Sequence, residues 1–381
     1  MSANLGIRLT LMAGAKVPRP LPADFVDLVE CVEVAQSCGG RGGFQIVLSA
    51  ARSGKGATDY AVIAKNTFKP FNRVLITVTF GPVPTVLMDG FVTRQELKPG
   101  TGDVDGRFVI TGEDVSVMMD LQARIAEHPG QSEQMIANKI LLKYVKYGVV
   151  PKVLPPPVLD VPLPTQRIPV QHGTDLQYLE RMASRFGYVF YVTPGPAPLA
   201  NVAYWGPPQW IGLPQRALTL TSGLDANVDT VCFEYDGLAP ATRWGRVQDG
   251  RSNRVAAVSV KSSTLPPLSR RRALSSNRPN VRRELLEHTE GRTLTQARAQ
   301  AQGRVNLSTT RVVSATGELD SVAYGGVLRP HALVGLRGAG LSYDGSYFVR
   351  EVHHVIKPGH YRQKFKLQRA GVGTLQPLVR P

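Results

Sequence analysis

Apolar and polar residues alternate with a period of two in short runs near the start of the chain. The clearest run is 74–80, in which every even-numbered residue is apolar, and a second β-branched run lies at 44–48. Such alternation is typical of β-strands with one buried face. This pattern therefore predicts β-structure with little helix for residues 1–112.

Two Asp-Gly pairs punctuate this first part of the chain. Asp89 and Gly90 separate the triplets Val-Leu-Met at 86–88 and Phe-Val-Thr at 91–93, and Asp105 and Gly106 precede another apolar run. Aspartate and glycine tolerate the positive φ angles of tight turns, so both pairs predict hairpins. Short strands joined by such turns favour a small barrel or sandwich.

The middle of the chain changes to helical spacing. Thr111 with Asp114 three residues later resembles a capping box and predicts a helix start. The buried face of that helix would be formed by Val115, Met118, Leu121 and Ile125. Ser132 predicts the cap of a second helix, which ends before Gly148.

A proline-rich connector precedes the clearest helix. Residues 151–169 contain seven prolines, which indicates an extended, non-helical stretch. Thr174 and Gln177 then form a capping box, Leu179 falls on the apolar stripe, and Gly187 is the expected stop. A strand is expected directly afterwards.

From residue 214 onward the pattern returns to β. A further capping box, Thr293 with Gln296, predicts one helix, and Asp344 with Gly345 predicts a hairpin. The expected strands are 217–221, 228–235, 255–260, 311–315, 332–337, 346–356 and 362–368.

The predicted fold class is therefore mainly β (α+β). Three domains are expected: a β domain at 1–112, a helical and α/β insert at 113–213, and a second β domain at 214–381. A basic loop at 261–291 interrupts the second β domain.

Composition narrows the class of protein. The chain has 381 residues, 43% of them hydrophobic and 19% charged, which excludes a disordered polyelectrolyte and a coiled-coil rod. No apolar run is long enough for a membrane helix, and no secretory signal is expected. Cys31, Cys38 and Cys232 cannot all pair, so reduced thiols in a cytoplasmic protein are expected.

The charge is unevenly distributed. Lys and Arg number 45 against 29 Asp and Glu, a formal net charge of +16. Residues 243–292 hold twelve cationic and four acidic residues, or half of that excess. Such a basic segment suits nucleic acid, an anionic membrane or an acidic protein partner.

The candidate contact residues in this segment are five arginines. They are Arg270, Arg271, Arg272, Arg282 and Arg283. Trp244 is the only aromatic residue nearby, whereas single-strand nucleic-acid binders interleave several aromatics with their cations. The segment is therefore either a solvated loop or a contact with an acidic neighbouring chain, and we favour the contact as the functional hypothesis.

Other motifs give no active site. Residues 52–56 resemble a phosphate loop but lack its first glycine and its final hydroxyl residue, so a surface turn is expected. His353 and His354 are consecutive in a predicted strand, so their rings point to opposite faces and cannot bind one metal ion. No enzyme activity, cofactor or metal is therefore expected.

Three segments resemble a known family. The segment GTDLQYLERMASRFGYVFYV at 173–192 is similar to the central signature of tail hub proteins, namely the phage late control protein D family and the hub portion of VgrG-type spikes. VITGEDVSVMMD at 109–120 resembles the end of that family's first barrel. GGVLRPHALVGLRG at 325–338 and YDGSYFVREVHH at 343–354 resemble its closing strands.

The resemblance implies a structural role without catalysis. It implies two tube-protein-like barrels per chain and a homotrimer that adapts the hexameric inner tube of a contractile tail to a trimeric spike. The implied partners are the inner tube protein, a separate spike protein, baseplate or sheath components, and a tape-measure or cargo protein. Neither nucleic acid nor stable membrane insertion is expected in this role.

Two other function classes remain as alternatives. One is a basic nucleic-acid-binding or packaging accessory protein, which steeply salt-dependent binding would reveal. The other is a hydrolase with an unmatched site. Synthesis and assembly in the bacterial cytoplasm, within a phage tail or injection particle, are expected for the hub.

Overall fold

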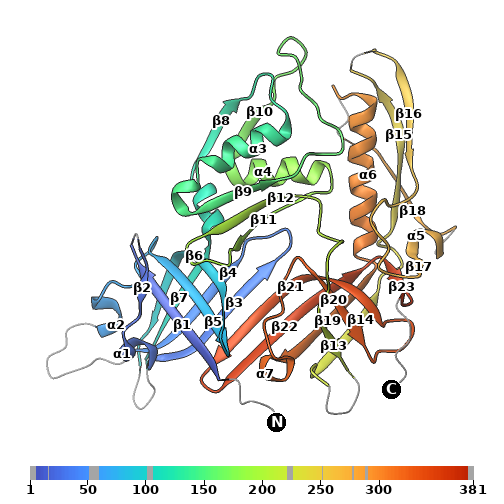
Figure 1. Cartoon of the computed structure of the whole chain (residues 1–381). Coiled ribbons are helices and arrows are strands. Elements are labelled where there is room, and N and C mark those ends of the chain that lie inside the picture. Colours follow the sequence, from blue (N-terminus) through green and yellow to red (C-terminus); the bar gives the residue numbers. More distant parts are fainter. Residues whose placement is uncertain are drawn as a thin grey trace.

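The structure is a computed structural model that describes residues 6–15, 17–50, 60–100, 106–220, 226–250, 252–276, 279–287 and 291–375 (Figure 1). It is mainly β, as predicted, with a few helices. Asp105 of one predicted turn and the loop at 52–56 lie outside these residues.

A large sheet of thirteen described strands runs through both ends of the chain. Its order is β14 (Thr230–Tyr235), β19 (Val313–Asp320), β22 (His360–Arg369), β21 (Gly345–Lys357), β3 (Val29–Ser37), β4 (Gly43–Ala50), β7 (Gly106–Asp114), β6 (Val83–Lys98), β5 (Arg73–Phe80), β1 (Ile7–Gly14) and β2 (Arg19–Pro20). β20 (Leu333–Arg337) branches from β21 and pairs in turn with β13 (Gln215–Thr219). The pairing of β21 with β3 joins the two ends into one sheet.

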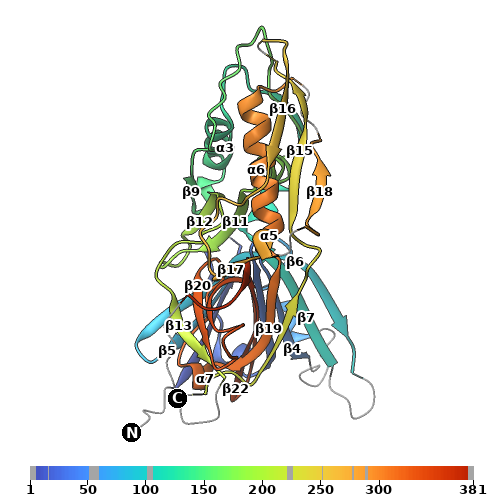
Figure 2. The same ribbon diagram turned by 90° about the vertical axis from the view of Figure 1, so that its right-hand side faces the viewer.

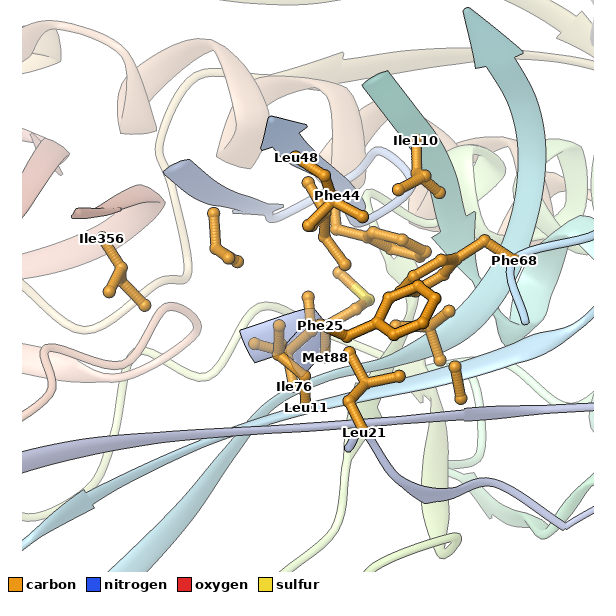
Figure 3. Packing of buried hydrophobic residues seen from close by; sticks show 14 of the residues in the cluster. Leu11, Leu21, Phe25, Phe44, Leu48, Phe68, Ile76, Met88, Ile110 and Ile356 are labelled. Carbon is orange, nitrogen blue, oxygen red and sulfur yellow. The ribbon is translucent and has the colours of Figure 1, made fainter. Parts of the chain in front are cut away.

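Each half of this sheet encloses its own hydrophobic core, because alternate side chains of its strands point inward. The first core draws Leu11, Ile46, Ile76 and Ile110 from four strands (Figure 3). Ile356 from β21 reaches into the same core, so the second half contributes to the first. A second cluster fills the other half, with Val313, Leu336, Tyr347, Val349, Phe365 and Leu367 among its members. Short helices α1 (Ala23–Val26), α2 (Ala61–Ala64) and α7 (Ser321–Tyr324) lie in the loops.

The predicted hairpin turn at Asp89 and Gly90 is wrong. Strand β6 runs without interruption through both residues, and Gly90 pairs with Val74 on one side and Asp114 on the other. Glycine is required there because a Cβ would collide with the backbone of Glu113. The glycine thus permits a close approach between strands and not a turn.

The insert stands above the first half of the sheet (Figure 1). Its elements are η1 (Val115–Met119), β8 (Ala123–Glu127), α3 (Glu133–Leu142), η2 (Val145–Tyr147), β9 (Val149–Val153), β10 (Val170–Thr174), α4 (Asp175–Arg185), β11 (Val189–Pro194) and β12 (Asn201–Gly206). Strands β11, β12 and β9 form one small sheet, and β10 pairs with β8.

The helix predicted from Thr111 is also wrong. Thr111 lies within β7, and Asp114 is the cap of η1, accepting a hydrogen bond from the Ser116 N–H at 2.8 Å. Ile125, expected on a buried helical face, lies in β8 and is 76% exposed. Strand pairing with β10 replaces the helix that local spacing favours.

The other predicted helix starts are confirmed. Ser132 accepts a hydrogen bond from the Met135 N–H at the start of α3. Thr174 forms a complete capping box with Gln177 at α4, and Gly187 beyond its end has a φ of 68°. Side-chain acceptors at these positions satisfy amide groups that the first turn leaves unpaired.

A separate unit stands beside the insert (Figures 1 and 2). It contains β15 (Ala241–Gln248), β16 (Val255–Val260), β18 (Arg282–Leu285) and α6 (Leu294–Thr310), with α6 starting at the predicted cap Thr293. These strands form their own sheet in the order β16, β15, β18. The described strands between residues 241 and 310 therefore lie outside the large sheet. Among the described residues, no helix is long and apolar enough to cross a membrane.

Candidate functional site

The two halves of the large sheet meet where β21 pairs with β3. His353 pairs with Ala35, and its Nε2 atom lies 3.1 Å from a carboxylate oxygen of Glu33. His354 is fully buried, and its Nδ1 atom is hydrogen-bonded to the Tyr361 hydroxyl at 2.9 Å. The two histidine rings therefore lie on opposite faces of the sheet, as predicted.

A shallow trough of about 570 Å³ crosses this junction. Charged side chains from neighbouring strands line it, and Lys364 lies between Glu318 of β19 and His353 of β21 in the register. Lys366 and Glu351 repeat this alternation one pair further along. Alternating charges on an open surface can select a partner by charge complementarity.

A second cavity, of about 640 Å³, lies where the insert and the two halves of the sheet meet. His331 stacks on Tyr191 there with ring centroids 3.6 Å apart. Burial lowers the pKa of His331 to about 3, so the imidazole is neutral at ordinary pH. The described residues that line the cavity include no carboxylate and no thiol.

A buried ion pair fastens the insert to the first half of the sheet. Arg73 donates to both carboxylate oxygens of Asp89 at 2.7 Å, and both side chains are at least nine-tenths buried. From the insert, Asn201 donates to Asp89 at 2.9 Å, and the carbonyl of Tyr147 accepts from Arg73 at 2.9 Å. The pair therefore fixes β5, β6, η2 and β12 together.

A second buried carboxylate anchors α4. Asp175 is fully buried and accepts hydrogen bonds from the Tyr144 hydroxyl at 2.8 Å and the Gln171 amide at 2.7 Å. The Lys143 ammonium lies 3.4 Å away. Desolvation and the bond to Asp175 raise the pKa of Tyr144. Asp175, which belongs to the segment 173–192, therefore has a structural role.

The five candidate arginines are exposed. Four of them lie in two different sheets, and Arg270 lies just outside both. Arg271 and Arg272 form the short strand β17 (Arg271–Arg272), which pairs with β23 (Gly371–Val372). Arg282 and Arg283 lie in β18, where Arg282 is 3.7 Å from Glu284.

The segment 261–291 is not the fully exposed loop that its composition suggested. Leu268, Ala273 and Leu274 are buried, and helix α5 (Ala273–Ser276) forms within it. Leu274 packs with side chains of α6 and its sheet. A few aliphatic residues suffice for this packing, so the lack of aromatic residues did not prevent it.

Sequence reasoning missed the most deeply buried cation. Arg369 is fully buried and donates to the backbone carbonyls of Gly371, Asp344 and Ser342 at 2.7–2.9 Å. Its guanidinium lies 4.5 Å from the ring centroid of Tyr347. The alternation of side chains along a strand could have indicated its burial, because the odd-numbered residues of β22, including Arg369, point inward.

The described residues contain no group of three or more His, Cys, Asp or Glu side chains that could hold a metal ion. Cys31, Cys38 and Cys232 are free thiols, as predicted. Burial raises the pKa of Cys38 to about 12, which keeps it protonated.

Comparison with known proteins shows the fold. The structure is similar to a tail protein from Neisseria meningitidis (TM-score 0.64, 13% identity, 97% of this chain and 98% of that chain) and to a 43 kDa tail protein of prophage MuSo2 from Shewanella oneidensis (TM-score 0.62, 14% identity, 96% and 99%). It is also similar to an E. coli type VI secretion component described as structurally similar to the T4 tail proteins gp27 and gp5 (TM-score 0.55, 12% identity, 93% and 77%). The sequence matches no family model and no curated protein. The chain thus has a phage-tail-type fold.

Proposed function

We propose that this chain is a structural hub of a contractile tail or injection system, which adapts a hexameric inner tube to a trimeric spike. The observation that carries the proposal is the likeness in fold, over nearly the whole chain, to phage tail proteins and a type VI secretion component. This role requires no catalysis by the chain.

The joined sheet supports a homotrimer as the working unit. Each chain presents two curved sheet halves with separate cores, linked through β21 and β3. Three chains arranged around an axis would present six such halves to a sixfold tube and three equivalent surfaces to the spike. Closed cyclic assemblies are common among homo-oligomers.

The proposed partners follow from this position. They are the inner tube protein, a separate spike protein and baseplate or sheath components, with a tape-measure or cargo protein inside the assembly. The hub would be made and assembled in the bacterial cytoplasm. The basic segment with Arg270, Arg271, Arg272, Arg282 and Arg283 would face an acidic neighbour and not nucleic acid.

The mass of the purified full-length chain, alone and mixed with its spike and tube proteins, tests the proposal. We expect a trimer that binds one spike trimer. A chain that stays monomeric with both partners present would contradict the hub role. Tight DNA binding that weakens steeply with salt would instead favour the packaging alternative.

A further inference from the structure

The sheet of β16, β15 and β18 has two faces of different character. One face packs on α6 through Val247, Val258 and Val260, which are buried (Figure 2). We call the opposite surface the outer face. From strand alternation and register it consists of Thr242, Trp244, Arg246, Gln248, Val255, Ala257, Ser259, Arg283 and Leu285.

Large apolar side chains are exposed on the outer face. Trp244 is 39% exposed, Leu285 58% and Val255 65%. Trp244 and Leu285 are partners in the parallel register of β15 and β18, so they lie side by side. A solvated sheet face is normally polar, whereas tryptophan at the centre of a patch is typical of binding hot spots.

The same face carries positive charge without a carboxylate. Among the described residues, neither Arg246 nor Arg283 forms an ion pair, and the guanidinium of Arg283 lies 4.4 Å from the ring centroid of Trp244. On the α6 side, Glu284 pairs with both Arg243 and Arg282, so one carboxylate offsets one of these two positive charges. The outer face, with Arg246 and Arg283 and no carboxylate, therefore carries more uncompensated charge than the α6 side.

We propose that the outer face docks an extended acidic segment of another protein. Arg283 of β18 pairs with Thr242 of β15. Thr242 lies four residues before Arg246 in the same strand, so the backbone levels of the two arginines are about 13 Å apart along the strand, with Trp244 midway. An extended segment spans the same distance between residues i and i+4. The partner therefore places carboxylates toward these two arginines and an apolar side chain at i+2, beside the exposed Leu285, which is level with Trp244.

The Arg283–Trp244 contact favours a protein over nucleic acid. Single-strand binders stack bases on exposed aromatic faces. Here the guanidinium covers the ring of the only aromatic residue on the outer face. A base would have to displace that cation, whereas a carboxylate can bind the guanidinium in place. The inference deepens one part of the proposed function, the acidic neighbour of the basic segment, and does not depend on the trimer.

Trp244 provides a direct readout of binding. The other two tryptophans, Trp205 and Trp210, are at most 3% exposed, so acrylamide quenches mainly Trp244. The probe is the end-blocked peptide Thr-Glu-Thr-Val-Thr-Glu-Thr, and the control peptide has Lys in place of Glu. We expect the acidic peptide to protect Trp244 from quenching in the full-length chain, less so as salt increases, and the lysine peptide to give no protection.

A matched pair of double variants assigns the site. Arg246→Ser with Arg283→Ser should weaken binding of the acidic peptide at least about tenfold, with an unchanged melting temperature. The control, Arg94→Ser with Lys98→Ser, removes the same charge from exposed positions of β6 and should bind as the parent does.

Three outcomes would overturn the proposal. One is no protection by the acidic peptide at millimolar concentration. Another is equal weakening in both double variants, which would indicate general charge attraction. The third is stronger protection by single-stranded oligo-dT that the outer-face variant loses, which would assign the face to nucleic acid. None of these results bears on the trimer mass, so they leave the hub proposal to its own test.

Discussion

Gly303 in the middle of α6 packs against the backbone of Gly187, just beyond the end of α4. A Cβ at Gly187 would lie 2.6 Å from the carbonyl oxygen of Gly303, and the nearest atoms to a Cβ at Gly303 would be backbone atoms of Phe186 and Gly187. Glycine inside a helix costs about 1 kcal/mol relative to alanine. Here it lets the insert and the α6 unit approach closely.

Gly303→Ala should therefore destabilise the protein, although helix propensity alone favours alanine. We expect the free energy of unfolding to fall by about 1–3 kcal/mol, as in other overpacked sites, measured by urea denaturation. Gly326→Ala is the control, because an added Cβ there meets nothing within 4 Å. A Gly303→Ala variant as stable as the parent would show that the two backbones can separate.

Helix α4 should behave as part of the core. Leu179 is fully buried, so Leu179→Ala should cost about 2–5 kcal/mol. Thr174→Ala should cost about 1 kcal/mol through the lost cap, and a little more because its hydroxyl also donates to Asp120 at 2.5 Å. Thermal melting of both variants checks the order. Equal melting temperatures for Leu179→Ala and the parent would place α4 outside the core.

Arg73→Met should be strongly destabilising because it removes the positive charge that pairs with the buried carboxylate of Asp89, to which the Asn201 amide also donates. The expected loss is about 3–5 kcal/mol by urea denaturation. Adding Asp89→Asn should recover part of it by removing the charge. Lys65→Met, which breaks the exposed pair with Asp24, should change the stability very little because solvent screens that pair. A small effect of Arg73→Met would mean that water reaches Asp89.

Two buried histidines should make the protein less stable in acid. Burial lowers the pKa of His331 and of His354 to about 3 from an ordinary value of 6.5, so only the unfolded chain binds these protons between those values. Their contribution to stability is complete above pH 6.5 and is lost progressively as the pH falls toward 3. His331→Asn with His354→Gln should flatten the fall in urea midpoint between about pH 7 and pH 4. An unchanged slope would contradict this assignment.

Asp114 should act in the opposite direction. Burial raises its pKa from 3.8 to about 6 despite hydrogen bonds from the Ser116 and Gly42 amides. The folded chain then holds this proton more tightly, so the contribution of Asp114 to stability grows as the pH falls from 6 to 3.8. Asp114→Asn should remove that gain and steepen the acid loss in the same urea measurement. A variant with the parental pH profile would place the pKa of Asp114 near its ordinary value.

Local signals in the sequence predicted much of the secondary structure. Thr174 and Thr293 start helices as expected, because capping depends on neighbouring residues only. The predictions of a turn at Asp89 and Gly90 and of a helix starting from Thr111 and Asp114 were wrong because tertiary contacts determine the backbone conformation there. In the first case Arg73 holds Asp89 within a strand.

The candidate contact arginines were identified from charge, and their contact role stays a prediction. The division of Arg271–Arg272 and Arg282–Arg283 between two sheets depends on pairings with strands distant in the chain, which local patterns do not encode. Trp244 was noted only as an isolated aromatic residue. Its position beside Arg283 and Leu285 follows from the parallel pairing of β15 with β18, separated by about forty residues.

The antiparallel join between β21 and β3 also determines how the chain bears mechanical load. Its register runs from Glu351 opposite Ser37 to Ile356 opposite Val32. A force that pulls the two halves apart along the strand axis loads all of these hydrogen-bonded pairs at once, in shear. A force perpendicular to the strands would break the hydrogen-bonded pairs one after another. The chain should therefore resist traction along β3 far better than peeling, and its orientation relative to the direction of pull would set its rupture force.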